Sequence, residues 1–222
     1  MELKVIAHFR SPFASKFGVP RQSGLAPALR GEVRFLPEYA AADAFRGMED
    51  YSHLWLIWGF SENMERGWSP TVRPPRLGGN ARMGVFATRS PFRPNPLGLS
   101  CVKLEKVEAG LLLVSGADLM DGTPIYDVKP YIPYADSIPD ASGGFTDSQS
   151  WEPLRVVFAE GTLNKVPEGQ RKALEEVLSC DPRPAYQRDQ ARRYGFRFAG
   201  MDVAFQVEGD CLTVVSVTAK SP

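Results

Sequence analysis

Histidine and cysteine are scarce in this chain of 222 residues, and this scarcity excludes several classes of site. The two histidines, His8 and His53, are too few for a histidine-based metal centre. The three cysteines lie far apart and form no CxxC pair, so neither a zinc site nor a disulfide framework is expected. We therefore expect no metal, and we expect the cysteines to be small buried apolar groups.

Long hydrophobic runs are missing too. The longest, Leu54 to Phe60, is far shorter than the roughly 20 residues that span a bilayer. Met1 to Lys4 leads directly into a strand-like run, without the pattern of a signal peptide. The composition, 43% hydrophobic and 23% charged, is that of an ordinary globular protein. We expect a cytoplasmic protein without a membrane partner.

The net charge gives no sign of a nucleic-acid partner, since 26 basic residues balance 26 acidic ones. The charges are nevertheless segregated along the chain. Six arginines and no Asp or Glu lie between Arg66 and Arg93, whereas six aspartates and one lysine lie between Asp118 and Asp147. The first segment suits phosphate and the second suits a cation. Alternatively, the two segments pack together and neutralise each other.

Short apolar runs bounded by glycine and proline predict strands in the first two-thirds of the chain. The runs are 5–6, 33–36, 54–60, 83–87, 99–107, 111–115 and 123–128. Residues 108–110 predict a hairpin turn, and residues 43–49 predict one short helix. Many short strands with few helices favour a mainly β fold, a small closed or nearly closed β-barrel.

The pattern changes after residues 136–150, whose polar composition is typical of a linker. Residues 167–179 carry an apolar stripe at helical spacing and predict a helix. A hairpin is expected from 196–207 and 212–217 around the turn 208–210. We therefore divide the chain into a β-barrel over residues 1–150 and a small α+β subdomain over residues 151–222.

A glycine-rich dinucleotide-binding turn is absent. Gly78-Gly79-Asn80 lacks the GxGxxG spacing and follows a proline-rich loop, not a strand. Asn95-Pro96 is followed by Leu97-Gly98, so the Asn/Asp-Pro-Pro-Tyr/Phe tetrapeptide of Rossmann-type adenine-N6 methyltransferases is missing as well. These absences argue against a Rossmann fold.

Four motifs resemble the TsaA-like family, and together they extend over nearly the whole chain. They are FGVPRQ (17–22), GVFATRSPFRPNPLGLS (84–100), MDGTPIYDVKPYIPYA (120–135) and DPRPAY (181–186). The resemblance implies a six-stranded type of barrel and a homodimer with S-adenosylmethionine bound near the subunit contact. It also implies a substrate, N6-threonylcarbamoyladenosine beside the tRNA anticodon, which is methylated on N6.

The resemblance assigns cofactor contacts to residues whose chemistry suits them. Arg21 or Arg89 can grip a carboxylate with two parallel hydrogen bonds, and Gln22 can bind adenine or the amino-acid head. Asp118 or Asp121 can stabilise the sulfonium or accept from ribose hydroxyls, although Asp121-Gly122 is equally consistent with a simple turn. At Ser61 we expect related sequences to have histidine. The full set is Pro20, Arg21, Gln22, Ser61, Glu62, Arg89, Leu99, Asp118, Leu119, Met120, Asp121 and Gly122.

The nucleophile requires help, because the N6 lone pair is delocalised into the neighbouring carbonyl group. The same carbonyl makes the N6–H more acidic, so we expect a general base or a positively charged pocket. Asp127 is our candidate for the base, with Lys129 and Tyr126 beside it in the segment YDVKPY.

A single-stranded anticodon loop calls for arginines that contact phosphates and aromatic faces that stack on bases. The candidates are Arg73, Arg76, Phe92 and Arg93 in the barrel, and Arg183 and Tyr186 in the C-terminal subdomain. Two other functions stay open: a non-catalytic RNA-binding barrel, and a methyltransferase that acts on a small molecule or a protein. Trp55, Trp58 and Trp68 suit either a dimer contact or the core.

Overall fold

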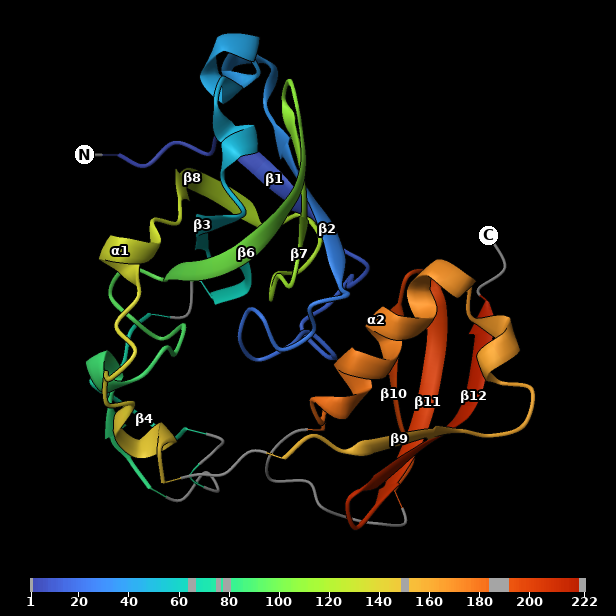
Figure 1. Cartoon of the computed structure of the whole chain (residues 1–222). Coiled ribbons are helices and arrows are strands. Elements are labelled where there is room, and N and C mark those ends of the chain that lie inside the picture. Colours follow the sequence, from blue (N-terminus) through green and yellow to red (C-terminus); the bar gives the residue numbers. More distant parts are fainter. Residues whose placement is uncertain are drawn as a thin grey trace.

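Six antiparallel strands close into a barrel in the order β1-β2-β7-β6-β3-β8 (Figure 1). The computed structural model describes residues 2–63, 67–74, 77, 81–148, 152–183 and 192–219. Alternate strand residues, such as Leu54 and Leu56, fill the interior. The strands are β1 (Ala7–Arg10), β2 (Arg30–Phe35), β3 (His53–Gly59), β6 (Leu97–Glu108), β7 (Leu111–Ser115) and β8 (Pro124–Pro130). The predicted closed β-barrel is confirmed.

Short elements decorate the barrel. A two-stranded ribbon pairs β4 (Thr71–Val72) with β5 (Met83–Gly84), and α1 (Pro133–Asp136) is a single turn. The 3-10 turns of this part are η1 (Pro37–Tyr39), η2 (Ala42–Phe45), η3 (Met48–Asp50), η4 (Ser61–Asn63), η6 (Val85–Ala87) and η7 (Gly144–Thr146). None of the helices in the described part of the chain is long and apolar enough to cross a membrane.

A second sheet, with the order β10-β11-β12-β9, forms the C-terminal domain. Its strands are β9 (Arg155–Phe158), β10 (Tyr194–Phe198), β11 (Met201–Glu208) and β12 (Cys211–Ala219), and β9 runs parallel to β12. Helix α2 (Glu168–Ser179) covers one face of this sheet with the predicted apolar stripe, and η8 (Leu163–Lys165) precedes it (Figure 1). The stripe is Ala173, Leu174, Val177 and Leu178.

Three loops leave the barrel at one rim. Antiparallel pairing places the ends of β1, β3 and β7 next to the beginnings of β2, β6 and β8. The segments 11–29, 60–96 and 116–123 therefore all start and finish at this rim, which we call the loop end. The first of them, residues 11–29, we call the strap.

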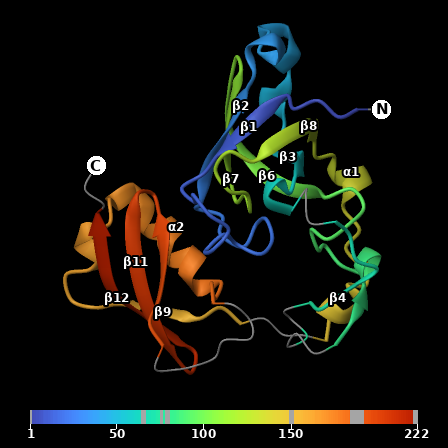
Figure 2. The same ribbon diagram turned by 180° about the vertical axis from the view of Figure 1, so that it is seen from behind.

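The strap belongs to the core of the C-terminal domain. Phe13, Ala26 and Leu29 are buried in the same hydrophobic cluster as helix α2 and strands β10 to β12. Both views of the ribbon place the strap between the barrel and this domain (Figures 1 and 2). The two parts of the chain are thus joined by shared packing as well as by the connecting segment.

Four sequence predictions of local structure were wrong. Residues 5–6 are not a strand, because β1 begins at Ala7. The helix expected over 43–49 is two 3-10 turns, because Gly47 adopts a left-handed φ of 83° between them. The strand over 83–87 ends at Gly84 and continues as a 3-10 turn. Residues 196–207 form two strands, not one, since Ala199 and Gly200 take positive φ values and make a turn.

Candidate cofactor and RNA site

Each of the three loops at the loop end contributes residues to one polar cluster. The Arg89 guanidinium, from the second loop, donates to Oε1 of Gln22 on the strap at 2.5 Å. The carboxyl group of Asp118, from the third loop, accepts a hydrogen bond from the backbone of Ser23 and lies within the electrostatic reach of Arg89. The structure therefore brings together three of the predicted cofactor residues.

Asp118 ends a hydrogen-bonded chain that begins inside the barrel. Trp58 donates from Nε1 to Oγ of Ser100 at 2.9 Å, and Ser100 donates to Oδ1 of Asp118 at 2.5 Å. The carboxyl group is closely surrounded by protein, although the residue as a whole is only partly covered. Burial raises the pKa of Asp118 above its ordinary value, while Ser100, nearby backbone N–H groups and the Arg89 charge oppose the rise. A cation placed here would stabilise the charged carboxylate.

The turn at Asp121-Gly122 ties the third loop to the strap. Oδ1 of Asp121 accepts from the backbone N–H of Ser11 at 3.1 Å, and Arg10 lies 3.3 Å from Oδ2. Gly122 has a φ of 78°, as a turn requires. In the same loop Leu119 is buried in the barrel core, and the carbonyl of Met120 accepts from Thr123. Asp121 thus acts as a structural anchor in this conformation.

The other predicted strap and second-loop residues differ in their exposure. Pro20 is buried, whereas Arg21 is exposed and donates to the backbone carbonyl of Arg183 at 3.1 Å. Ser61 and Glu62 are exposed on η4, directly after β3.

A second group of predicted residues lies on the outer wall of the barrel. Leu99 and Asp127 both pair with Ile57 of β3, one from each side, and Leu99 is 54% exposed. Lys129 lies 2.9 Å from Asp127 and forms an ion pair with it. Tyr126 packs against Gly59, where an added Cβ would meet its hydroxyl at 2.7 Å. In the described part of the chain, no hydrogen bond or ion pair links Asp127 or Lys129 to the Arg89 cluster.

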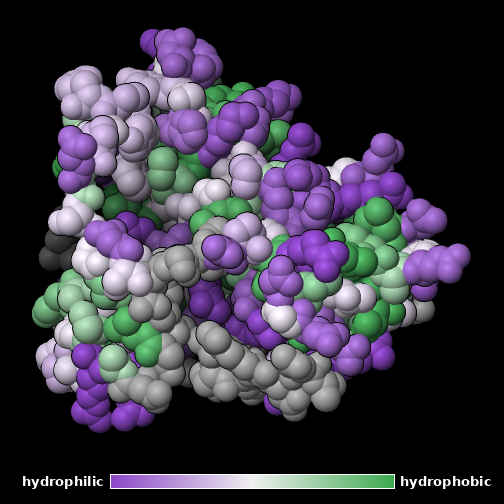
Figure 3. All heavy atoms as spheres, turned by 60° about the horizontal axis from the view of Figure 1, so that its bottom comes forward, coloured by the Kyte–Doolittle hydropathy of each residue, from purple (hydrophilic) through white to green (hydrophobic). Residues whose placement is uncertain are grey.

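The arginine-rich second loop forms a lobe with exposed aromatic rings. Phe86 and Trp68 are 73% and 55% exposed, and Phe92 is 37% exposed. Arg93 donates to the carbonyls of Thr88 and Val85 and lies 5.9 Å from the centroid of the Phe86 ring. Figure 3 brings the bottom of Figure 1 forward and shows apolar surface among hydrophilic side chains on this side. Arg73 is exposed on the lobe, whereas Arg76 lies outside the described residues.

In the C-terminal domain, Arg183 forms an ion pair with Asp181. Its guanidinium donates to both oxygens of Asp181, at 2.8 and 2.9 Å, and this interaction raises the pKa of Arg183. Tyr186 lies outside the described residues. Within the described residues no group of three His, Cys, Asp or Glu side chains is placed to hold a metal ion.

Comparison with known proteins identifies the fold and its two parts. The N-terminal domain of tRNA-methyltransferase O matches residues 8–137, and the TrmO C-terminal domain matches residues 152–220. The chain belongs to the tRNA-methyltransferase O family. This family membership confirms the resemblance inferred from the four motifs.

Individual relatives agree with the family over most of the chain. The tRNA (adenine(37)-N6)-methyltransferase of Escherichia coli K12 is 48% identical over 197 residues, 84% of each chain. A Pseudomonas aeruginosa protein named as a candidate S-adenosylmethionine-dependent methyltransferase, RcsF, is 46% identical over 206 residues, 89% of each chain. The crystal structure of TrmO from Pseudomonas aeruginosa superimposes with a TM-score of 0.81 at 35% identity and covers 99% of both chains.

Several residues of the candidate site were not predicted from the sequence. Ser100 was missed as the partner of Asp118, Trp58 was missed as the partner of Ser100, and Phe86 was assigned to a strand. Ser100 did carry a signal: it is a polar residue at an inward position of a strand, between Gly98 and Val102. Phe86 carried none, because its exposure depends on how the lobe folds.

Asp118→Asn should weaken the binding of S-adenosylmethionine roughly tenfold or more, because an amide cannot supply the charge that complements a sulfonium. Calorimetry on the purified chain measures this change. Asp140→Asn removes an exposed carboxylate from the segment after the barrel and is the matched control. Equal affinities for the parent and Asp118→Asn would contradict the role given to this carboxylate.

The same substitution should also change how stability depends on pH. The pKa of Asp118 is higher in the folded than in the unfolded chain, so the parent loses stability as the pH rises through the interval between the two values. The variant lacks this loss. The unfolding free energy of Asp118→Asn, relative to the parent, should therefore increase with pH in urea titrations without cofactor. A constant difference would contradict a buried, destabilising carboxylate.

Proposed function

We propose that this protein transfers the methyl group of S-adenosylmethionine to N6 of N6-threonylcarbamoyladenosine at position 37 of tRNA. The chain is an S-adenosylmethionine-dependent tRNA methyltransferase that works from a β-barrel. The observation that carries the proposal is family membership over both parts of the chain, together with relatives named for adenine 37 and its N6 atom.

The cluster at the loop end fits the chemistry of the cofactor. S-adenosylmethionine combines a sulfonium cation, a carboxylate and a purine, and it supplies an activated methyl group when bound. Asp118 is a buried carboxylate whose raised pKa indicates that its charge lacks full compensation. Arg89 and Arg21 can hold the cofactor carboxylate, while Gln22 has both a donor and an acceptor for adenine or the amino-acid head. The neighbouring positions from Pro20 to Gln22, from Ser61 to Glu62 and from Asp118 to Gly122 complete the proposed contacts.

The reaction on the nucleoside requires both positioning and proton removal. The N6 atom gains the methyl group and loses its proton, and the nitrogen and methyl carbon must approach to roughly 3–3.5 Å beforehand. We assign the proton to the carboxylate of Asp127, which forms an ion pair with Lys129 and whose neighbour Tyr126 packs against Gly59 at the rim.

A homodimer would bring the two groups of proposed site residues, the loop-end cluster and the residues on the barrel wall, close together. Leu99 is a proposed cofactor contact but faces outward with Ile57 and Asp127 on the barrel wall, where Leu97 and Trp55 add further apolar surface. A second subunit that packs on this wall would bring its own loop end next to Asp127. The dimer contact and the cofactor site would then be adjacent, in a protein that meets its tRNA in the cytoplasm.

The RNA surface is proposed on the second-loop lobe and the C-terminal domain. Arg73 can contact phosphates, and the exposed faces of Phe86, Trp68 and Phe92 can stack on unpaired bases. Arg93 supports Phe86 from within the lobe. Arg76 and Tyr186, outside the described residues, remain candidates from the sequence, as does Arg183. In this arrangement residues 1–150 form the catalytic domain and residues 151–222 add tRNA contacts.

The decisive experiment compares tRNA nucleosides by mass spectrometry. Purified protein is incubated with S-adenosylmethionine and tRNA from a strain that lacks this gene, and the nucleosides are then separated. N6-threonylcarbamoyladenosine should lose intensity while a species one methyl group heavier appears. Methylation of any other nucleoside, or of none, would refute the proposed substrate.

Asp127→Asn should slow single-turnover methylation by about a hundredfold or more, the range in which a general base contributes. Cofactor affinity should hardly change, because Asp127 is assigned to the N6 proton and is not among the proposed cofactor contacts. An unchanged single-turnover rate would remove Asp127 from the mechanism.

Phe86→Ala should raise the Kd for tRNA roughly fivefold to a hundredfold, because base stacking on an aromatic ring contributes about 1–3 kcal/mol. Filter binding at fixed salt measures the change. Tyr134→Ala removes another strongly exposed ring, 91% exposed on α1, and should leave the Kd unchanged. Equal losses in both variants would argue against a specific stacking platform.

A further inference from the structure

The strap is held from the side of the C-terminal domain by several backbone contacts. Four interactions span its length: Ala199 N–H to the Pro12 carbonyl at 3.0 Å, Arg21 to the Arg183 carbonyl at 3.1 Å, Cys180 Sγ to the Leu25 carbonyl at 3.6 Å, and Ala28 N–H to the Glu176 carboxylate at 2.7 Å. The Glu176 side chain is only 18% exposed, so it holds Ala28 from within the contact between α2 and the strap.

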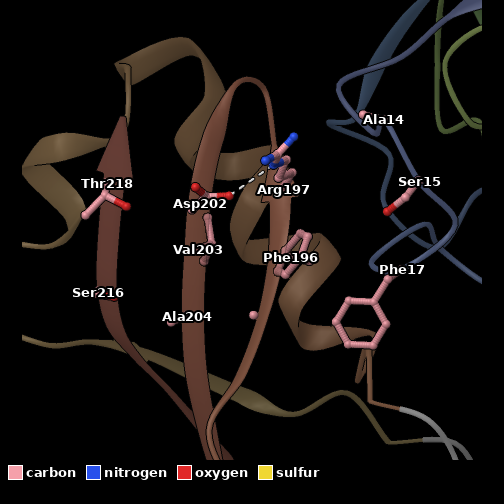
Figure 4. Close-up of a pocket in the computed structure, with 11 residues that line it drawn as sticks. Ala14, Ser15, Phe17, Phe196, Arg197, Asp202, Val203, Ala204, Ser216 and Thr218 are labelled. Carbon is pink, nitrogen blue, oxygen red and sulfur yellow. Dashed lines mark hydrogen bonds and ion pairs between the residues drawn. The ribbon is translucent and has the colours of Figure 1, made fainter. Parts of the chain in front are cut away.

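Aromatic packing adds to these contacts (Figure 4). Phe13 and Phe17 of the strap lie 6.4 and 6.3 Å, centroid to centroid, from Phe196 of β10. Gly18 lies so close to this ring that an added Cβ would be 2.5 Å from Cδ2 of Phe196. Beside the contact, Ala14, Ser15 and Phe17 of the strap and the open face of β10, β11 and β12 line a groove of about 520 Å³.

Neighbouring strap residues are held from the other side by the barrel. Gln22 accepts from Arg89, Ser23 donates to Asp118, and Gly24 donates to the Gly116 carbonyl at 2.8 Å. The strap is irregular over its whole length and has no helix or strand of its own. Its conformation between residues 17 and 24 is therefore set by two surfaces that face each other.

We propose that Glu176 and Phe196 are positioning residues for the cofactor site, so that the C-terminal domain is a structural part of that site. This inference rests on the proposed cofactor role of Arg21 and Gln22. Ordering a loop on binding costs free energy, and a loop ordered beforehand binds more tightly. Glu176 and Phe196 supply that order to the strap without contacting the cofactor themselves.

A pair of substitutions at one position tests the hydrogen bond. Glu176→Ala should raise the Kd for S-adenosylmethionine, measured by calorimetry on the full chain, roughly tenfold, while Glu176→Gln, whose amide oxygen can still accept from Ala28, should stay within about threefold of the parent. The KM for the cofactor should follow the Kd. The kcat at saturating cofactor and the KM for tRNA should change less than about twofold.

A pair of glycine substitutions tests the aromatic contact. Gly18 and Gly47 have φ values of 95° and 83°, so alanine strains the backbone at both positions, but only the Cβ at residue 18 meets Phe196. Gly18→Ala should weaken cofactor binding at least as much as Glu176→Ala, and Gly47→Ala should not weaken it. Circular dichroism melting of every variant sets a common measuring temperature at which all are folded.

Several outcomes would overturn the inference. Parent-like affinity in both Glu176→Ala and Gly18→Ala, equal weakening in Gly47→Ala, or a rise confined to the KM for tRNA would each do so. In all three cases the parent still binds the cofactor and methylates tRNA, and the proposed function stands. If the parent itself binds no S-adenosylmethionine, the proposed function fails first and this inference fails with it.

Discussion

Antiparallel closure of the barrel is the constraint on which the candidate site depends. Because neighbouring strands run in opposite directions, the strap and the loops 60–96 and 116–123 return to one rim. Gln22 and Arg89 meet there although 67 positions separate them. A Rossmann enzyme would hold a nucleotide with a glycine-rich turn at a helix N-terminus. Here, loops from three strand pairs bring together the guanidinium, amide and carboxylate groups of the candidate site.

The strap connects the candidate site to the C-terminal domain. Connecting segments usually run over a protein surface, but this one buries Phe13 and Leu29 in the core of the C-terminal domain. The C-terminal domain and the strap therefore share one core. Removing this domain would expose one side of the segment that carries Arg21 and Gln22. Loss of activity in a truncated chain would therefore not show that the domain binds RNA.

The sequence patterns predicted an element correctly where a single hydrophobic periodicity extends over the whole element. The stripe from Ala173 to Leu178 faces the core as its spacing required, and the hairpin turns at Gly110, whose φ is 76°. The patterns failed where a turn lies inside a continuous apolar run. The buried residues are at even positions through Phe198 and at odd positions from Met201. This shift in the alternation marks the turn at Ala199 and Gly200, which was predicted as continuous strand.

The sequence by itself determined the β-rich class, helix α2 and the identity of the chemical groups, because periodicity, turn residues and motifs are local properties of the chain. Only the tertiary structure decided which groups meet. It linked Asp118 to Trp58 through Ser100, and it turned Leu99 and Asp127 to the outer wall. It also buried Phe13, Ala26 and Leu29 of the strap in the core of the C-terminal domain. These outcomes depend on barrel closure and on packing between distant segments, and no local pattern encodes either.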